Sequence, residues 1–303
     1  MLCGLRLIVA ITCYVFCAAF ATAAGLSDLN LTISASDDSA ATRAILASLH
    51  EHFPTATVQT PSQIATTKLP PRTVHIAIGP AALKALSANS DAPIIAIYTS
   101  SAAYEKITSE APARRRPSLT AIYAEPNPKD QFQLIRAIYK RPVPVAALIQ
   151  SSSYIVPILQ RAADDANIDL TIETVAPGET IFHALNRLAS RPVLLAVPDP
   201  SIYNSETLRT LLMATYRREQ ALVGYSATFV NAGALATTTS DPSQIAAQLK
   251  ELLRDYAETG RLPSEQFPKY FSVLVNDSVA RSLNLIIDDS VRQLARNPKE
   301  KTP

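Results

Sequence analysis

A serine at the end of a predicted strand is the first residue that could act as a nucleophile. Gly224-Tyr225-Ser226 resembles the start of the G-x-S-x-G motif, in which a sharp turn between a strand and a helix exposes the serine hydroxyl. Thr228 stands where the second glycine belongs, and no histidine follows His183. Because a hydrolase with this motif needs a histidine later in the chain, the segment indicates a strand-end loop that lines a cleft.

The histidines, glycines and charges predict neither a metal site nor a nucleotide or nucleic-acid partner. His50 and His52 lie two residues apart on a predicted helix, a spacing that places them on different faces. The chain has 7 glycines and contains neither G-x-G-x-x-G nor G-x-x-x-x-G-K-[ST], the loops that cradle phosphates. Its 28 lysines and arginines are nearly balanced by 26 acidic residues, which argues against a nucleic-acid surface. We therefore expect no cofactor.

Hydroxyl-bearing and acidic residues follow most of the predicted strands. In open α/β sheets ligands bind outside the carboxyl ends of the strands, so these residues are the candidates for binding. The set holds two acids and no lysine, arginine or histidine, and several members precede helices, whose free N–H groups favour anions. The candidate ligand-binding residues are Ser36, Thr99, Ser100, Glu125, Ser151, Ser152, Ser153, Asp199, Tyr225 and Ser226.

Short apolar segments alternate with amphipathic helices along the chain. Continuous apolar strands separated by helices are typical of a parallel sheet covered on both faces, so the pattern predicts an α/β fold with two doubly wound parallel-sheet lobes. Strands of the first set are predicted over 29–34, 56–59, 74–79, 94–98 and 119–124, with helices over 39–52, from 80 and around 104. Strands of the second set are predicted over 143–150, 170–175, 193–197 and 222–225, with helices over 129–139, 155–166, 180–189 and 206–217.

The boundary between the lobes is expected near residue 125. One lobe is predicted over residues 25–125 together with about 232–303, and the other over 126–231. A multi-strand hinge should join them, with chain crossings at Glu125-Pro126 and at 229–231 and a third in the last strand. The C-terminal part is predicted to contain strands over 235–238 and 270–275 and helices from 242 and over 278–283.

The first 24 residues have the organisation of a secretory signal peptide. Arg6 precedes an almost wholly apolar stretch over 7–20, and small residues follow it. Cleavage is expected after Ala23 or Ala24, which predicts a periplasmic location. The alternative is an uncleaved membrane anchor, for which the apolar stretch is short. Cleavage would leave the mature chain without cysteine and hence without disulfides, because the cysteines are Cys3, Cys13 and Cys17.

Several segments of the second half carry a family resemblance through their order and spacing. They are V-P-D-P-S-I-Y-N at 197–204, L-V-G-Y-S at 222–226, A-G-A-L-A at 232–236, F-S-V-L-V-N at 271–276 and V-A-R-S-L at 279–283. On these segments the chain resembles the ABC transporter substrate-binding protein family, which has the type I periplasmic-binding fold.

The resemblance implies a two-lobed clamp without catalytic activity. Such proteins close around a small solute and present the closed form to a membrane permease of an ABC transporter. By similarity the loops with Thr99 and Ser100, 151–153, Asp199 and Tyr225 would line the cleft. An amino-acid-like ligand is one expectation, with its carboxylate at a helix N-terminus and its amino group on Asp199.

Two positions depart from the family pattern, and two other functions stay open. Thr99-Ser100 replaces the usual Asp-Pro, and Thr120-Ala121 replaces the usual Thr-Gly, so the ligand does not follow from the resemblance. The same clamp could serve as the solute-sensing subunit of a membrane signalling receptor. A periplasmic hydrolase that uses two carboxylates, Glu125 and Asp199, is the other alternative.

Overall fold

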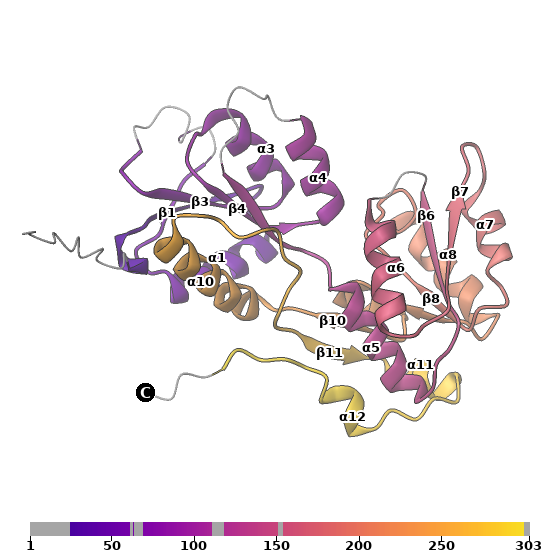
Figure 1. Cartoon of the computed structure of the whole chain (residues 1–303). Helices are drawn as coiled ribbons and strands as arrows, with labels where there is room; N and C mark the ends of the chain where they lie inside the picture. The colour runs from indigo at the N-terminus through magenta and orange to yellow at the C-terminus, as the bar shows by residue number, and fades with distance from the viewer. Residues whose placement is uncertain (1–24, 61–62, 64–68, 111–117, 151–153, 300–303) are drawn as a thin grey trace, which may run out of the picture.

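Two sheets, each with its own helices, form the two lobes of the molecule (Figure 1). The computed structural model describes residues 25–60, 63, 69–110, 118–150 and 154–299. The first sheet has the order β2-β1-β3-β4-β5, and all its neighbouring strands are parallel. Its strands are β1 (Asn30–Ala35), β2 (Thr57–Val58), β3 (Thr73–Ile78), β4 (Ile94–Thr99) and β5 (Leu119–Tyr123).

The second sheet repeats the order of the first and adds one strand at its edge. Its order is β11-β10-β9-β8-β6-β7, and only the pair β10–β11 is antiparallel. In both lobes the strand order reverses between the first and third strands, where an α/β sheet offers its binding crevice. The strands are β6 (Val145–Gln150), β7 (Leu170–Val175), β8 (Val193–Leu195), β9 (Ala221–Val223), β10 (Ala236–Thr239) and β11 (Ser272–Val275).

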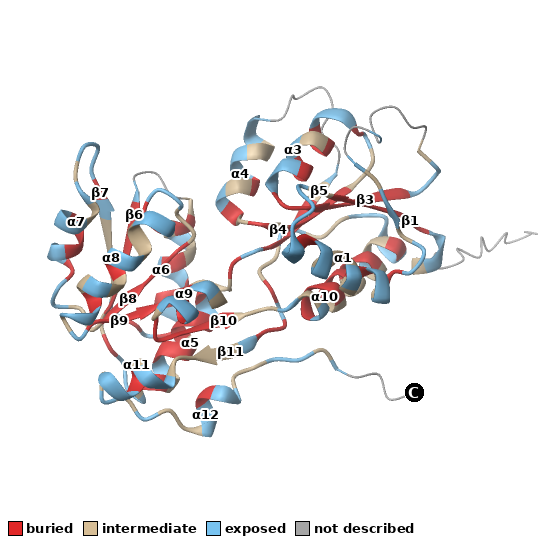
Figure 2. Ribbon diagram, turned by 180° about the vertical axis from the view of Figure 1, so that it is seen from behind, coloured by how far each residue is buried: buried red, intermediate tan, exposed pale blue. Residues whose placement is uncertain are grey.

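Helices cover both faces of the first sheet, which explains its continuous apolar strands. Leu49 and Leu249 pack on one face from α1 and α10, and Leu83 and Tyr104 pack on the other from α3 and α4. Figure 2 shows the buried strands between these layers. The helices are α1 (Ala40–His52), α3 (Pro80–Asn89), α4 (Ser101–Glu110), α5 (Pro128–Tyr139), α6 (Ile155–Asp165), α7 (Ile181–Arg187), α8 (Ser205–Tyr216), α9 (Ala227–Ala232), α10 (Pro242–Thr259), α11 (Asp277–Ser282) and α12 (Asp289–Arg292), with a 3₁₀ turn, η1 (Leu26–Asp28).

Polar caps and prolines start the helices that adjoin the chain crossings. The side chain of Asn127 accepts a hydrogen bond from the N–H of Lys129 and precedes Pro128 in α5. Asp241 forms a capping box with Gln244 at the start of α10, and a proline again occupies the first turn. These local signals fix where the chain turns into each helix after it crosses between the lobes.

Within the described residues the chain crosses between the lobes three times, and two details of the predicted boundary are corrected. The first crossing, between β5 and α5, lies at Glu125-Pro126 as predicted, and the third lies between α10 and β11. The second lies between β10 and α10, whereas the predicted hinge at 229–231 falls within α9. The C-terminal part is divided, because α10 packs on α1 while β10 and β11 belong to the second sheet. The prediction of one lobe over 232–303 was therefore wrong for these strands.

The C-terminal tail runs across the hinge and contacts both lobes. Arg296 and Phe271 exchange two backbone hydrogen bonds of 2.8 Å, so the tail pairs with the third crossing. The Arg296 guanidinium pairs with Asp130 of α5 and lies 4.9 Å from the centre of the Phe271 ring. Beside it, Asn297 accepts a hydrogen bond from Gln244 of α10 at 3.2 Å. The tail thus links α5, the third crossing and α10.

The predicted signal peptide over residues 1–24 lies outside the described residues. Among the helices of the described ranges, none is both long and apolar enough to span a membrane.

Candidate functional site

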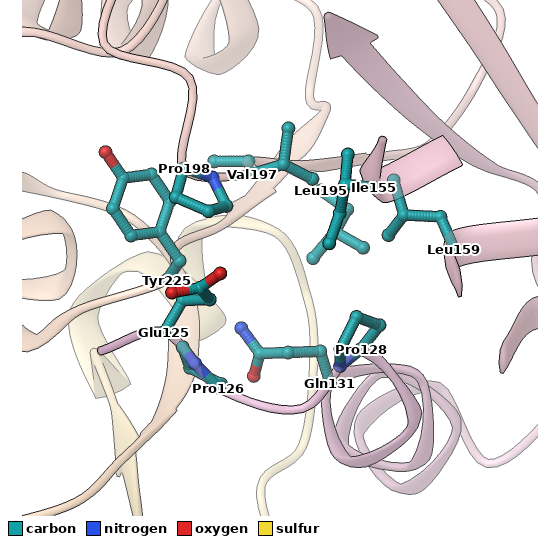
Figure 3. A pocket seen from close by; sticks show the side chains of 11 residues that line it. Glu125, Pro126, Pro128, Gln131, Ile155, Leu159, Leu195, Val197, Pro198 and Tyr225 are labelled. Atoms are coloured by element: carbon teal, nitrogen blue, oxygen red, sulfur yellow. The ribbon is translucent and has the colours of Figure 1, made fainter. Parts of the chain in front are cut away.

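A small hollow lies where β5, β8 and β9 end, with α5 and α6 beside it (Figure 3); the empty space of about 300 Å³ there includes open solvent. Its lining is mostly apolar, and the Glu125 carboxyl group points into it. A concave apolar site with few polar groups is the usual form of a small-molecule site. The lining residues are Glu125, Pro126, Pro128, Gln131, Ile155, Leu159, Leu195, Ala196, Val197, Pro198 and Tyr225.

Glu125 is a buried carboxyl group held at the first turn of α4. Glu125 is only 3% exposed. It accepts hydrogen bonds from the Ser101 N–H, at 2.9 and 3.2 Å to its two oxygens, and from the Ser101 hydroxyl. Burial raises the pKa of Glu125, and the Ser101 donors lower it by less. The helix N-terminus that favours an anion is therefore already occupied by a carboxyl group of this chain.

Replacing Glu125 with glutamine is expected to change how stability depends on pH. Because the folded state binds the Glu125 proton more tightly than the unfolded state, the free energy of unfolding should fall as pH rises above about 4.5 through the raised pKa. Glu125→Gln removes this loss, so the variant should gain on the wild type as the pH rises from about 4.5. A gain of about 1 kcal/mol would raise Tm by about 2–4 °C.

Thermal unfolding of both proteins across this pH range measures the effect. Burial also raises the pKa of Asp130. Because Asp130 is present in both proteins, a shallower decline in the free energy of unfolding with rising pH should remain in both. Parallel Tm curves for the wild type and the variant would show that the Glu125 carboxyl is not disfavoured in its ionised form.

Tyr225 forms the aromatic wall of the hollow. Its ring lies 4.5 Å from the Phe229 ring, and its hydroxyl donates a 3.4 Å hydrogen bond to the carbonyl of Tyr203. Burial raises the pKa of Tyr225 to about 12, with smaller contributions from Asp199 and Glu125. The preceding Gly224 leaves no room for a side chain, because a Cβ there would lie 2.3 Å from the Phe229 Cβ. The ring is therefore held by close packing after β9.

Tyr154, at the start of α6, has a buried hydroxyl group with no hydrogen-bond partner among the described residues. Burial raises the pKa of Tyr154, and the nearby Ser101 and Glu125 shift it by smaller amounts in opposite directions. Burial raises the pKa of Tyr123, at the end of β5, and Tyr154 raises it further. The Tyr123 ring packs edge-on against the Phe267 ring of the third crossing, with 5.1 Å between the ring centres. Sequence reasoning missed Tyr154, although its position after β6 is the same signal that selected the serines before it.

Asp199 connects two strand ends of the second lobe. Its carboxylate accepts hydrogen bonds from the N–H of Gln150 at 2.8 Å and of Ser201 at 3.1 Å, and from the Ser201 hydroxyl. The loop after β8 is thus tied to the end of β6, beside the point where the strand order reverses. A direct contact of Asp199 with a ligand stays a prediction.

The remaining hydroxyl residues are distributed around the strand ends. Ser36 donates to the Ile78 carbonyl at 2.8 Å and accepts from the Ala82 N–H at 3.1 Å, so it ties β1 to α3. Ser100 accepts a 3.2 Å hydrogen bond from the Ala103 N–H in α4. Neither residue lines the hollow around Glu125.

Thr99 and Ser226 have different environments. Thr99 is fully buried, and its hydroxyl has no hydrogen-bond partner among the described residues. Ser226 precedes α9 and lines a second hollow beside Tyr225, together with residues of the hinge. The predicted site residues Ser151, Ser152 and Ser153 lie outside the described residues. Of the ten predicted residues, the structure brings Glu125 and Tyr225 together in one hollow.

In the part of the chain that the structure describes, no three His, Cys, Asp or Glu side chains form a group that could hold a metal ion.

Comparison with solved structures identifies the fold. A ligand-free, open substrate-binding protein with adhesive properties from Clostridium difficile aligns with a TM-score of 0.64 and 12% identity, over 90% of this chain and 100% of that one. A Streptococcus pneumoniae ABC domain in complex with L-Trp aligns with a TM-score of 0.56 and 14% identity, over 88% and 99%. An arabinose-binding protein from Geobacillus stearothermophilus aligns with a TM-score of 0.51 and 11% identity, over 84% and 99%.

These similarities confirm the predicted two-lobed α/β fold, which is that of type I periplasmic binding proteins. No protein-family model matches the sequence. A search of curated proteins also found no significant match.

Proposed function

We propose that this chain is a periplasmic solute-binding protein that closes its two lobes around a small molecule. The observation that carries the proposal is the hollow at the strand ends, which lies between Glu125 of the first crossing and residues of the second lobe. Rotation at the three crossings would change the distance between these walls, and a ligand that contacts both would favour the closed form. No step of this mechanism requires catalysis.

The partner in this proposal is the membrane permease of an ABC importer. The fold shared with a substrate-binding protein and with an ABC domain supports this choice. A membrane signalling receptor is the alternative partner, because the closed form would present the same surface to either. Signal-peptide cleavage and export to the periplasm belong to the same proposal.

Mass spectrometry of small molecules released from the purified, folded protein tests the proposal. We expect one compound in near-stoichiometric amount, or recovery of such a compound after incubation with a metabolite extract. Its addition to the emptied protein should raise Tm and lower the radius of gyration. A compound that binds and stabilises the protein without compaction would contradict the clamp.

A further inference from the structure

The hollow contains a carboxyl group without a positive partner. Among the described residues that line it, Glu125 is the one with an ionisable carboxyl or basic group, and the others are apolar or neutral. The donors to Glu125, the N–H and hydroxyl of Ser101, are both neutral. A buried carboxylate is costly unless a charge pairs with it, so the hollow is suited to an incoming cation.

The surroundings of the hollow add aromatic rings and further carboxylates. Burial raises the pKa of both Tyr225 and Tyr154, and nearby carboxylates raise it further: Glu125 for both, Asp199 for Tyr225 and Glu105 for Tyr154. Aromatic faces attract cations, most strongly where water is excluded. The Tyr225 ring, which packs on Phe229, offers such a surface beside the carboxyl group. A positive charge placed here would therefore meet favourable groups on two sides.

Among the described residues that line the hollow, no basic side chain is present for a ligand carboxylate. The first-turn N–H of α4 that could bind it already donates to Glu125. Lys129 and Arg161 line a neighbouring groove between α5 and α6, and Lys129 pairs with Asp165 at 3.8 Å. An anion in the hollow would therefore lose water without gaining a basic side chain as a partner.

We propose that the ligand is an organic cation, an amine or quaternary ammonium with a compact apolar body, and that it needs no carboxylate. Its charged nitrogen would pair with Glu125 beside Tyr225, and its body would lie against Leu195 and Ile155. This inference rests on the proposed binding function and narrows it to one ligand class. It departs from the amino-acid-like ligand, in which Asp199 would hold the amino group.

Three compounds of one skeleton test the charge requirement by calorimetry with the emptied full-length mature protein. They are phenethylamine, which carries the ammonium alone; phenylalanine, which adds a carboxylate; and 3-phenylpropionate, which carries the carboxylate alone. We expect phenethylamine to bind at least about tenfold more tightly than phenylalanine, and 3-phenylpropionate not to bind at millimolar concentration. Equal or tighter binding of either carboxylate compound, or no binding of phenethylamine, would overturn the inference.

Two matched variants test whether Glu125 is the partner. Glu125→Gln should weaken phenethylamine binding by about tenfold or more, while Glu110→Gln, an exposed change of the same kind at the other end of α4, should stay within about twofold. Unchanged affinity in Glu125→Gln would overturn the inference.

If a sugar or an amino acid compacts the protein and phenethylamine does not bind, the ligand class is wrong and the clamp stands. If no bound solute compacts it, the proposed function itself fails.

Discussion

Gln131→Leu is expected to lower the free energy of unfolding by about 2–4 kcal/mol and to weaken solute binding by about tenfold. Gln131 is 3% exposed and projects from α5 to β10, the strand that leads into the second crossing. Its amide nitrogen donates to the Gly224 carbonyl at 2.5 Å, and its amide oxygen accepts from the Thr238 N–H at 2.9 Å. Leucine would leave these buried backbone groups without that partner and release α5 from β10.

Gln220→Leu is the matched control in the same lobe. Gln220 is 2% exposed and also donates to two backbone carbonyls, of Leu188 at 3.0 Å and of Arg191 at 2.7 Å. Its loss should cost about 1–3 kcal/mol but leave solute affinity unchanged, because its partners lie away from the crossings. Urea unfolding and calorimetry measure both quantities. An equal effect of the two variants on affinity would contradict a role for Gln131 in solute binding, either at the hollow that it lines or beside the second crossing.

Arg296→Met should cost about 2–3 kcal/mol, although it changes one residue of a tail. Asp130 is 4% exposed and would keep a carboxylate without its guanidinium partner. Burial raises the pKa of Asp130 and Arg296 lowers it, so loss of Arg296 raises it further. The free energy of unfolding of the variant should then fall as the pH rises above about 3.8, over a wider range than in the wild type. The destabilisation by Arg296→Met should therefore be largest near neutral pH and should shrink toward about pH 4.

Arg292→Met provides the control for this prediction. Arg292 also pairs with an aspartate, Asp277, but the side chains are 50% and 55% exposed. An exposed ion pair contributes little, so this change should stay within about 0.5 kcal/mol. Chemical unfolding at two pH values compares the pair of variants. Similar costs for both, or a cost of Arg296→Met that does not vary with pH, would show that the tail does not hold Asp130.

The strands and helices were predictable because their signals are local. Local signals predict the bounds of these elements to within a few residues of those observed. Examples are the apolar run over 143–150 and the Asp241-Pro242 start of α10. The sheet to which β10 and β11 belong was not predictable in this way. Both strands are short, and the same pattern would suit either lobe, because the choice depends on pairing with β9 across the sheet.

The candidate site was predictable only in part. Position after a strand selected Glu125 and Tyr225, which do share a hollow. The hydrogen bond that Asp199 accepts from the Gln150 N–H could not be read from sequence, since 49 positions separate the two residues. The contacts of Gln131 and the pair Arg296–Asp130 join still more distant segments, and no short motif encodes them.

The distance between the lobes is the quantity that tests the clamp most directly. Lys84→Cys in α3 and His183→Cys in α7 place spin labels at exposed positions on opposite lobes. Figure 1 shows both helices away from the chain crossings. Cleavage of the predicted signal peptide would leave no other cysteine, because the native ones are at positions 3, 13 and 17. Saturation with the solute recovered from the protein should shorten the mean label-to-label distance and narrow its distribution. An unchanged distance with the solute bound would contradict closure of two lobes around a ligand.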